Sequence, residues 1–148
     1  MNLVEQLEKN MIEAMKNHEK EKLIVIREIK SGMKQAHIDQ KKELNDELLI
    51  DVVSRGIKTR KESIKEFEKG GRNDLIEKTQ SEIDILSKYL PEQLSEEELL
   101  KVIEKVFEQV KPESAKDMGK VMGVITPLVK GKADMGSVSS LIRDKLEG

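Results

Sequence analysis

The sequence has no cysteine and few aromatic residues: two Phe, one Tyr and no Trp among 148 residues. Without cysteine the chain can form no disulfide, no thiolate zinc site and no cysteine nucleophile. With so few rings, the core must be packed by Leu, Ile, Val and Met, as in helical bundles, where stripes of aliphatic side chains interdigitate. Few segments alternate apolar and polar residues, so the pattern gives little support to β-strands.

Long apolar runs are also missing. No stretch approaches the ~18 apolar residues that a membrane-spanning helix needs. The N-terminal residues lack the apolar stretch of a secretory signal. From these absences we expect a cytoplasmic protein that does not associate with membranes.

The residues that usually carry catalysis or bind metals do not form a recognisable pattern. His18 and His37 are the only histidines, and neither belongs to a ligand-spaced pair, whereas metal or general-base chemistry needs converging partners. The segment from Gly131 to Ser137 lacks the lysine that follows the second glycine of a phosphate-binding loop, and no strand precedes it. We therefore expect no catalytic site, no cofactor and no metal.

Apolar residues recur with helical spacing almost from end to end, which predicts an all-α fold. In the first part we expect helices over about residues 3–15, 21–38, 46–69 and 73–90. Arg60 and Lys61 interrupt the apolar stripe of the third helix by one turn. Gly70-Gly71 should end that helix, Asn73 should cap the next one, and Pro91 should end it.

The remainder predicts three short helices. Ser95-Glu96-Glu97-Glu98 matches a capping box, and Asp134 should cap the last helix. Gly119 and Gly123, four residues apart, should allow another helix to approach closely. We place the domain boundary in the segment Pro91–Leu94, which gives an N-terminal domain of long helices, 1–92, and a small three-helix C-terminal domain, 93–148.

Charge is distributed unevenly within the second part, although the net charge of the whole chain is only −2. Residues 95–113 carry three Lys against six Glu, whereas residues 116–145 carry six Lys or Arg against three Asp. A local basic face can bind an anion even in an acidic chain. The candidate nucleic-acid-binding residues, which we call the basic set, are Lys116, Lys120, Lys130, Lys132, Arg143 and Lys145.

Two of these lysines flank Gly131 just before the last helix, where free N–H groups favour anions. Asp134 can itself fill that role, and an ordinary solvated face is the alternative interpretation of the basic set. Single-stranded nucleic acid usually stacks on aromatic side chains, which are scarce here. Folded RNA, recognised through its phosphates and shape, fits these residues better.

Three segments resemble the YqeY family: Tyr89-Leu90-Pro91-Glu92-Gln93-Leu94, Met118-Gly119-Lys120-Val121-Met122, and Gly131-Lys132-Ala133-Asp134 followed by Val138. Members of this family are short proteins similar to the C-terminal part of the B subunit of glutamine-dependent aspartyl/glutamyl-tRNA amidotransferase. The resemblance covers nearly the whole chain and implies an all-helical, two-part protein ending in a GatB/YqeY-type domain. Met135 departs from the small residue expected before the last helix.

The resemblance implies that this tail lies against transfer RNA in the amidotransferase. It also implies that other domains carry out the amido-transfer chemistry. This chain would then share ancestry with a carbon–nitrogen ligase that uses glutamine as amido donor, without having that activity itself. We expect a non-catalytic module associated with tRNA or other structured RNA. The alternatives are a protein-interaction adaptor that uses the long N-terminal helices, or an accessory to a glutamine-dependent amidotransferase. Steep salt dependence would favour RNA binding, whereas salt-tolerant binding would favour apolar helix docking.

Overall fold

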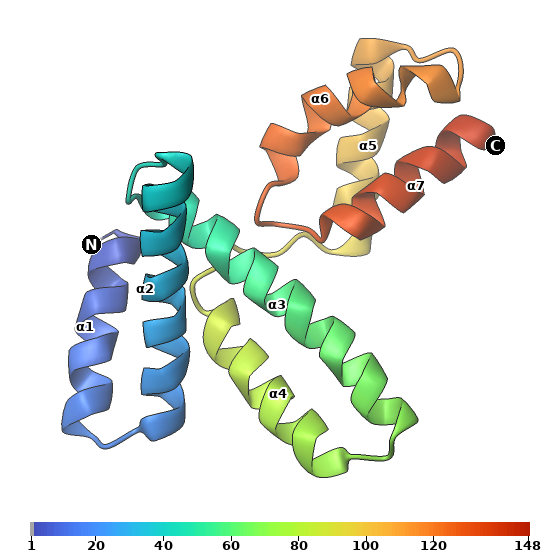
Figure 1. The fold of residues 1–148 in the computed structure, drawn as a ribbon. Coiled ribbons are helices and arrows are strands. Elements are labelled where there is room, and N and C mark those ends of the chain that lie inside the picture. Colours follow the sequence, from blue (N-terminus) through green and yellow to red (C-terminus); the bar gives the residue numbers. More distant parts are fainter. Residues whose placement is uncertain (1) are drawn as a thin grey trace. The chain divides into compact units, whose positions relative to one another are not determined.

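The computed structural model describes residues 2–148, and all regular structure in that range is helical. Seven α-helices and one short 3₁₀ helix account for it, with no strand among the described residues (Figure 1). The predicted all-α fold is confirmed. None of the described helices is both long and apolar enough to cross a membrane.

The chain divides into two compact units, one ending at Leu90 and the other spanning Pro91–Gly148. That residues 1–92 and 93–148 are domains able to fold by themselves stays a prediction. Each unit is built around its own cluster of buried aliphatic side chains.

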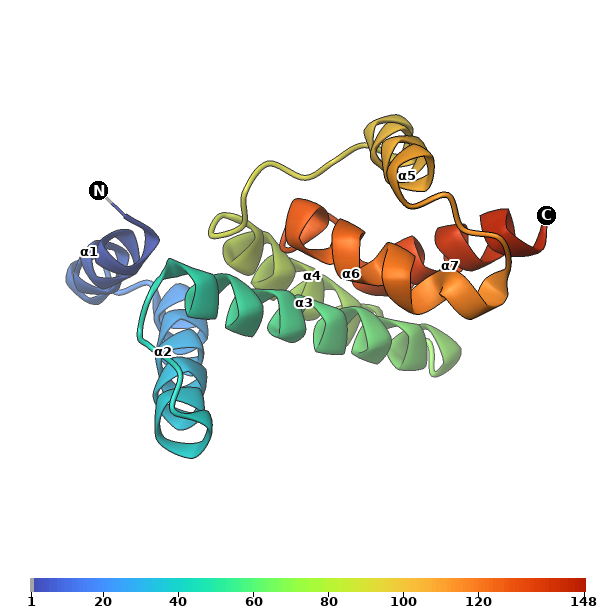
Figure 2. The ribbon, with the colours of Figure 1, turned by 90° about the horizontal axis from the view of Figure 1, so that it is seen from above.

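The first unit contains α1 (Leu3–Lys16), α2 (Lys20–Gln40), α3 (Asp46–Lys69) and α4 (Asn73–Ser87). α1 lies beside α2, and α3 lies beside α4 (Figure 2). The Asp46 carboxylate accepts hydrogen bonds from the backbone N–H groups of Leu3 and Val4, both at 3.1 Å. These bonds tie the start of α1 to the start of α3, because a helix N-terminus has unpaired N–H groups that an anion satisfies.

The junction between α3 and α4 differs from the prediction at both ends of α4. Asn73 is the first residue of α4 rather than its cap, since Arg72 holds the cap position without a side-chain hydrogen bond. The Arg72 carbonyl already accepts from Ile76 N–H at 3.1 Å, so the helix starts one residue earlier than it would with Asn73 as its cap. α4 ends at Ser87 rather than near Leu90, because the N–H groups of Tyr89 and Leu90 bond to carbonyls three residues back, at 3.0 and 3.2 Å, and so form a tighter turn before Pro91.

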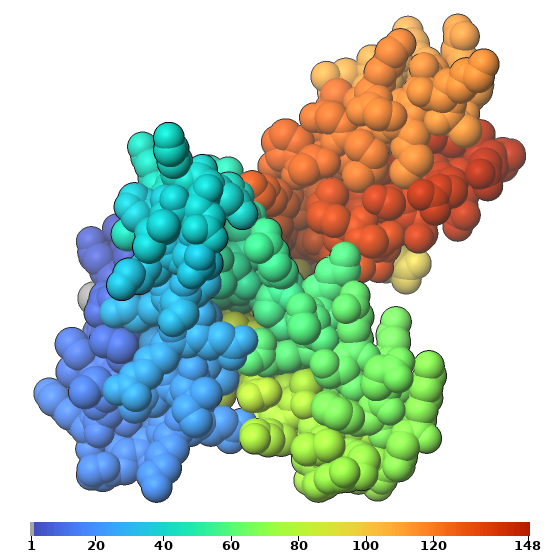
Figure 3. All heavy atoms as spheres, viewed as in Figure 1, coloured from blue at the N-terminus to red at the C-terminus, as the bar shows by residue number. Residues whose placement is uncertain are grey.

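The second unit contains α5 (Glu96–Val110), a 3₁₀ turn η1 (Ala115–Asp117), α6 (Met118–Val129) and α7 (Met135–Glu147). The predicted capping box is confirmed: Ser95 Oγ accepts from Glu98 N–H, and the Glu98 carboxylate accepts from Ser95 N–H, both at 3.1 Å. Met135 begins α7 and packs against the core of this unit without disturbing the turn. α6 and α7 form one broad face, and α5 lies behind them (Figures 1 and 3).

Candidate nucleic-acid interface

All six side chains of the basic set are exposed and belong to the second unit. The structure does not gather them into one cluster. Lys116 lies in η1 and Lys120 in the first turn of α6, Lys130 and Lys132 follow the end of α6, and the other two lie on α7. α6 has 12 residues, so the two pairs of lysines are separated by roughly 18 Å of helix.

At the start of α6, one lysine of the pair has an acidic neighbour. Lys120 Nζ lies 3.7 Å from Asp117 Oδ1, yet its side chain remains 76% exposed. The second carboxylate oxygen of Asp117 accepts a hydrogen bond from Glu113 N–H at 2.8 Å, and this bond holds the pKa of Asp117 below its ordinary value. Lys116 makes no side-chain interaction within the described residues, so this end of α6 retains an accessible positive charge.

At the other end of α6 the chain turns sharply. Gly131 adopts a φ of +75°, which a residue with a side chain rarely adopts. Lys132 donates its backbone N–H to the Val129 carbonyl at 2.8 Å. Its side chain is exposed and makes no ion pair or hydrogen bond in the described part of the chain.

The N-terminus of α7 is already occupied by a carboxylate of the chain. Asp134 Oδ2 accepts hydrogen bonds from Ser137 N–H at 3.0 Å and from Ser137 Oγ at 3.1 Å, which confirms the predicted cap. Because this carboxylate pairs with the Ser137 N–H and places a negative charge at the helix end, the α7 N-terminus is less favourable for an external anion. The basic character of this region therefore comes from side chains rather than from the helix end.

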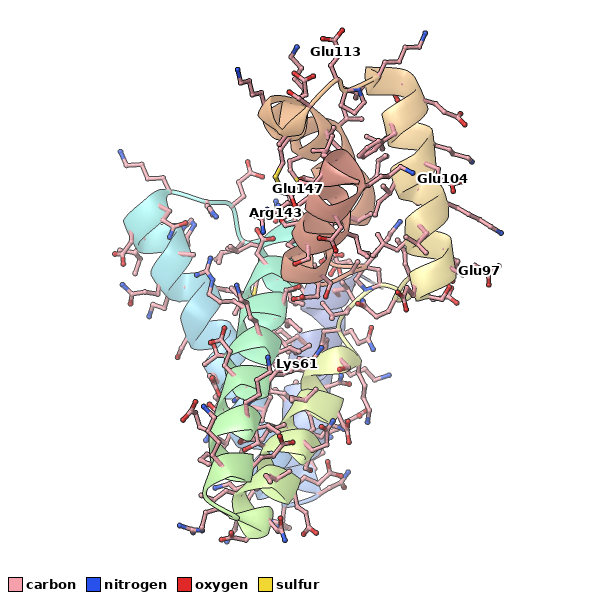
Figure 4. All side chains as sticks on the ribbon, turned by 90° about the vertical axis from the view of Figure 1, so that its right-hand side faces the viewer. Lys61, Glu97, Glu104, Glu113, Arg143 and Glu147 are labelled. Carbon is pink, nitrogen blue, oxygen red and sulfur yellow. The ribbon has the colours of Figure 1, made fainter. Side chains whose placement is uncertain are left out.

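The two basic residues of α7 face different directions. Residues two apart on a helix do not share a face. Lys145 Nζ lies 5.2 Å from the centroid of the Phe107 ring on α5, a cation–π contact. Arg143 consequently lies on the flank of α7 away from α5, on the same side as Glu147 (Figure 4). Lys145 is thus engaged within the unit, and Arg143 remains exposed beside an acidic neighbour.

The outer side of α6 is smooth and open. A Cβ added at Gly119 or at Gly123 would meet no atom within 4 Å. The expectation that these glycines admit another helix of this chain is therefore wrong, because the helices of the unit pack against the opposite side, through Val121 and Ile125. The surface of α6 is therefore uncovered at Gly119, beside Lys120, and at Gly123, one turn further along the helix.

The first unit offers no comparable chemistry. A cavity of about 260 Å³ lies among α2, α3 and α4, with a floor of aliphatic side chains and glycine and a polar rim that includes Arg55, Thr59 and the Glu28–Arg60 ion pair. No histidine or cysteine lines this cavity. Within residues 2–148, no three His, Cys, Asp or Glu side chains converge as metal ligands.

Sequence reasoning missed one residue that shapes the basic region. The Gln93 side-chain amide donates to the Gly131 carbonyl at 2.7 Å, and the backbone N–H of Leu94 donates to the Lys132 carbonyl at 2.8 Å. Both donors belong to the first of the three motif segments, and both acceptors belong to the third. That both segments carry family motifs was a signal that the two segments lie close together. Neither segment by itself indicated which atoms would form the hydrogen bonds.

These features define an all-helical protein whose second unit carries an exposed basic side next to a bare helix surface. A family model described as "Yqey-like protein" matches residues 4–146, nearly the whole chain. The chain belongs to the YqeY family.

Curated relatives share this similarity. A protein of Pyrenophora tritici-repentis named "Altered inheritance of mitochondria protein 41, mitochondrial" is 30% identical over 141 residues, covering 93% of this chain and 77% of that protein. Proteins of the same name from Lachancea thermotolerans and Candida glabrata are 41% identical over 88 residues and 40% over 93. Those two matches cover 59% and 62% of this chain and about half of each relative, 47% and 51%.

The names of these relatives overturn the expected cytoplasmic location, because they describe mitochondrial proteins. The expectation came from the lack of an apolar N-terminal stretch. Mitochondrial targeting segments are amphipathic and rich in Arg rather than apolar, so that lack does not argue against mitochondria.

Proposed function

We propose that the second unit is a non-catalytic module that binds folded RNA, with transfer RNA as the expected target. The observation that carries the proposal is the open side of α6, where the backbone is uncovered at Gly119 and Gly123 and exposed lysines lie at both ends of the helix. Lysine side chains at both ends supply phosphate contacts, and the glycines let an RNA backbone come close. The resemblance noted in the sequence implies a relation to the tail of amidotransferase B subunits, and a tail that lies against transfer RNA would favour the same target.

Geometry favours a folded RNA over a single strand. The two lysine ends lie roughly 18 Å apart, a separation that suits phosphates of two strands bordering a groove better than a continuous track along one strand. The only aromatic side chain of the second unit, Phe107, is partly buried beneath Lys145 and offers no stacking platform.

The test is tRNA binding measured at several salt concentrations. The double variant Lys116→Ala/Lys132→Ala should bind more weakly, and its slope of log affinity against log salt should flatten by up to about 0.9 for each duplex-like contact removed. The matched control is Lys61→Ala/Lys105→Ala, which removes the same charge from α3 and α5. Failure of the wild type to bind tRNA at low salt, or an unchanged slope in the first variant, would favour the protein adaptor.

The same proposal includes the absence of glutaminase and ATPase activity in this protein. The chain has no cysteine, and its two histidines lie on exposed positions of the first unit. The purified protein should show neither glutaminase nor ATPase activity. Activity that disappears on mutation of one named residue would contradict this and would favour an accessory or catalytic role in amido transfer.

A further inference from the structure

The first and third family motifs are joined by a hydrogen-bonded clamp at the turn that carries Lys132. Gln93 and Gly131 are 38 residues apart in the sequence, and their contact is a side-chain amide on a backbone carbonyl at 2.7 Å. The next residue of each segment forms a second hydrogen bond, in which the backbone N–H of Leu94 donates to the Lys132 carbonyl at 2.8 Å. Two consecutive carbonyls that follow the end of α6 are thus held by two consecutive residues.

The clamp depends on a side-chain nitrogen that donates two hydrogen bonds. Gln93 Nε2 carries two hydrogens, and it has two acceptors: the Gly131 carbonyl and the Pro91 carbonyl, the latter at 2.9 Å. Both acceptors are oxygens without a hydrogen, so the amide nitrogen and not the amide oxygen must face them. A carboxylate of the same length would place negative charge against two carbonyl oxygens.

The clamp is anchored on both sides. The Leu94 side chain packs against the buried cluster of the second unit, which holds the donor segment in place. On the acceptor side, the positive φ of Gly131 and the Lys132 N–H bond to Val129 define a tight turn. The backbone of Lys132 is therefore fixed through both its N–H and its carbonyl, while its side chain is left exposed to solvent.

We propose that Gln93 is a positioning residue, which holds the Gly131 turn in a single conformation and so presents the Lys132 ammonium to an RNA phosphate. This inference rests on the proposed function. Gln93 acts through Lys132: a turn that samples several conformations must be ordered on binding, and that ordering reduces affinity. The family motif at residues 89–94 then contributes to binding without touching the ligand.

The experiment uses the full chain and two readouts. Gln93→Met keeps the length of the side chain and removes both donors, and Gln109→Met, at an exposed position of α5, is the matched control. Without RNA, Gln93→Met should shift the amide NMR signals of Gly131 and Lys132 and accelerate hydrogen exchange at the Leu94 N–H. With tRNA, it should lower affinity about fivefold, as expected for one lost net hydrogen bond.

A double-mutant cycle separates positioning from general destabilisation. In the Lys132→Ala background, Gln93→Met should leave tRNA affinity nearly unchanged, because the group that it positions is gone. An equal loss in both backgrounds, or unchanged amide signals in Gln93→Met, would overturn the positioning role while the RNA-binding proposal stands. Lack of tRNA binding by the wild type would overturn both.

Discussion

Arg60 lies in the apolar stripe of α3, between Ile57 and Ile64, where helical spacing calls for an aliphatic side chain. Its guanidinium contacts Glu28 Oε2 of α2 at 2.6 Å, Glu82 Oε1 of α4 at 3.4 Å and the Gly56 carbonyl at 3.2 Å. Burial lowers the pKa of Arg60, but the hydrogen bonds and charges of Glu28 and Glu82 outweigh burial and raise it above its ordinary value. One side chain thus joins three helices while only 13% of it is exposed.

Removing this guanidinium should destabilise the first unit. In Arg60→Met, the Glu82 carboxylate, which is only 20% exposed, loses its guanidinium donor, and the Gly56 carbonyl loses the additional side-chain bond. We expect the free energy of unfolding to fall by about 1–3 kcal/mol, which is less than for a fully buried pair because Glu28 is largely solvated. Urea denaturation measures the change. Arg55→Met on the same helix should alter stability by less than about 0.5 kcal/mol, and a similar loss in both variants would contradict this role for Arg60.

Glu98 gives the second residue-level prediction, which concerns pH. The Ser95 N–H bond holds the pKa of Glu98 below its ordinary value, so folding favours the ionised carboxylate. The stabilisation is complete above the unfolded-state pKa, near 4.3, and is lost as pH falls through the lower folded-state pKa. Wild type should exceed Glu98→Gln in Tm at pH 7, and that difference should shrink at about pH 3.

Circular dichroism melts at both pH values test this. Glu104→Gln, at an exposed position of the same helix, is the control and should show no comparable pH-dependent difference. If the Tm gap between wild type and Glu98→Gln were the same at both pH values, the charge of Glu98 would have no part in the capping box.

At the scale of the element, two helical glycines, Gly32 of α2 and Gly123 of α6, have opposite surroundings. A Cβ at Gly32 of α2 would lie 2.8 Å from Val52 Cγ1 of α3, closer than real Cβ atoms approach a neighbour. At Gly123 of α6 the same atom would meet nothing within 4 Å. The first glycine permits two helices to pack closely, and the second leaves a helix surface bare.

The two Gly→Ala variants should therefore change stability in opposite directions. Gly32→Ala should destabilise by about 1–3 kcal/mol, because overpacking forces α2 and α3 apart. Gly123→Ala should stabilise by up to about 1 kcal/mol, since alanine is the better helix former and no clash offsets the gain. Thermal and urea unfolding of both variants measure the signs, and destabilisation by Gly123→Ala would show that its surface is covered in the folded protein.

At the scale of the whole molecule, we expect the second unit to fold alone if it retains its clamp. A fragment of residues 91–148 keeps Gln93 and Leu94, whereas one starting at Ser95 loses both donors to the Gly131 turn. At under 60 residues the unit is near the lower size limit for a stable core, so two hydrogen bonds and the Leu94 side chain matter.

The fragment 91–148 should show dispersed amide NMR signals and cooperative thermal unfolding, and the fragment 95–148 should melt at a lower temperature. Identical melting of the two fragments would mean that the clamp contributes nothing to stability. Collapsed amide dispersion in the longer fragment would mean that the two units do not fold independently.

Sequence alone determined the features that depend on residues close together in the chain. Helical periodicity, the Ser95–Glu98 box, the Asp134 cap and the break at Gly70-Gly71 all depend on contacts within one or two turns, and each is present in the structure. The all-α fold followed from the same local patterns. The start of α4 was misplaced by one residue because Asn73 is a preferred cap residue, whereas the structure has Arg72 at the cap position without a side-chain hydrogen bond.

Tertiary structure alone decided the pairings between distant residues. It placed Arg60 against Glu28 and Glu82, Lys145 over Phe107, and Gln93 on Gly131, and it left Gly119 and Gly123 uncovered. Lysine, arginine and glutamine have long side chains with several possible partners, and a helical pattern says which face they occupy but not what lies opposite. The packing of helices supplies that second surface, so the division of the basic set into engaged and accessible charges emerges only when the chain is folded.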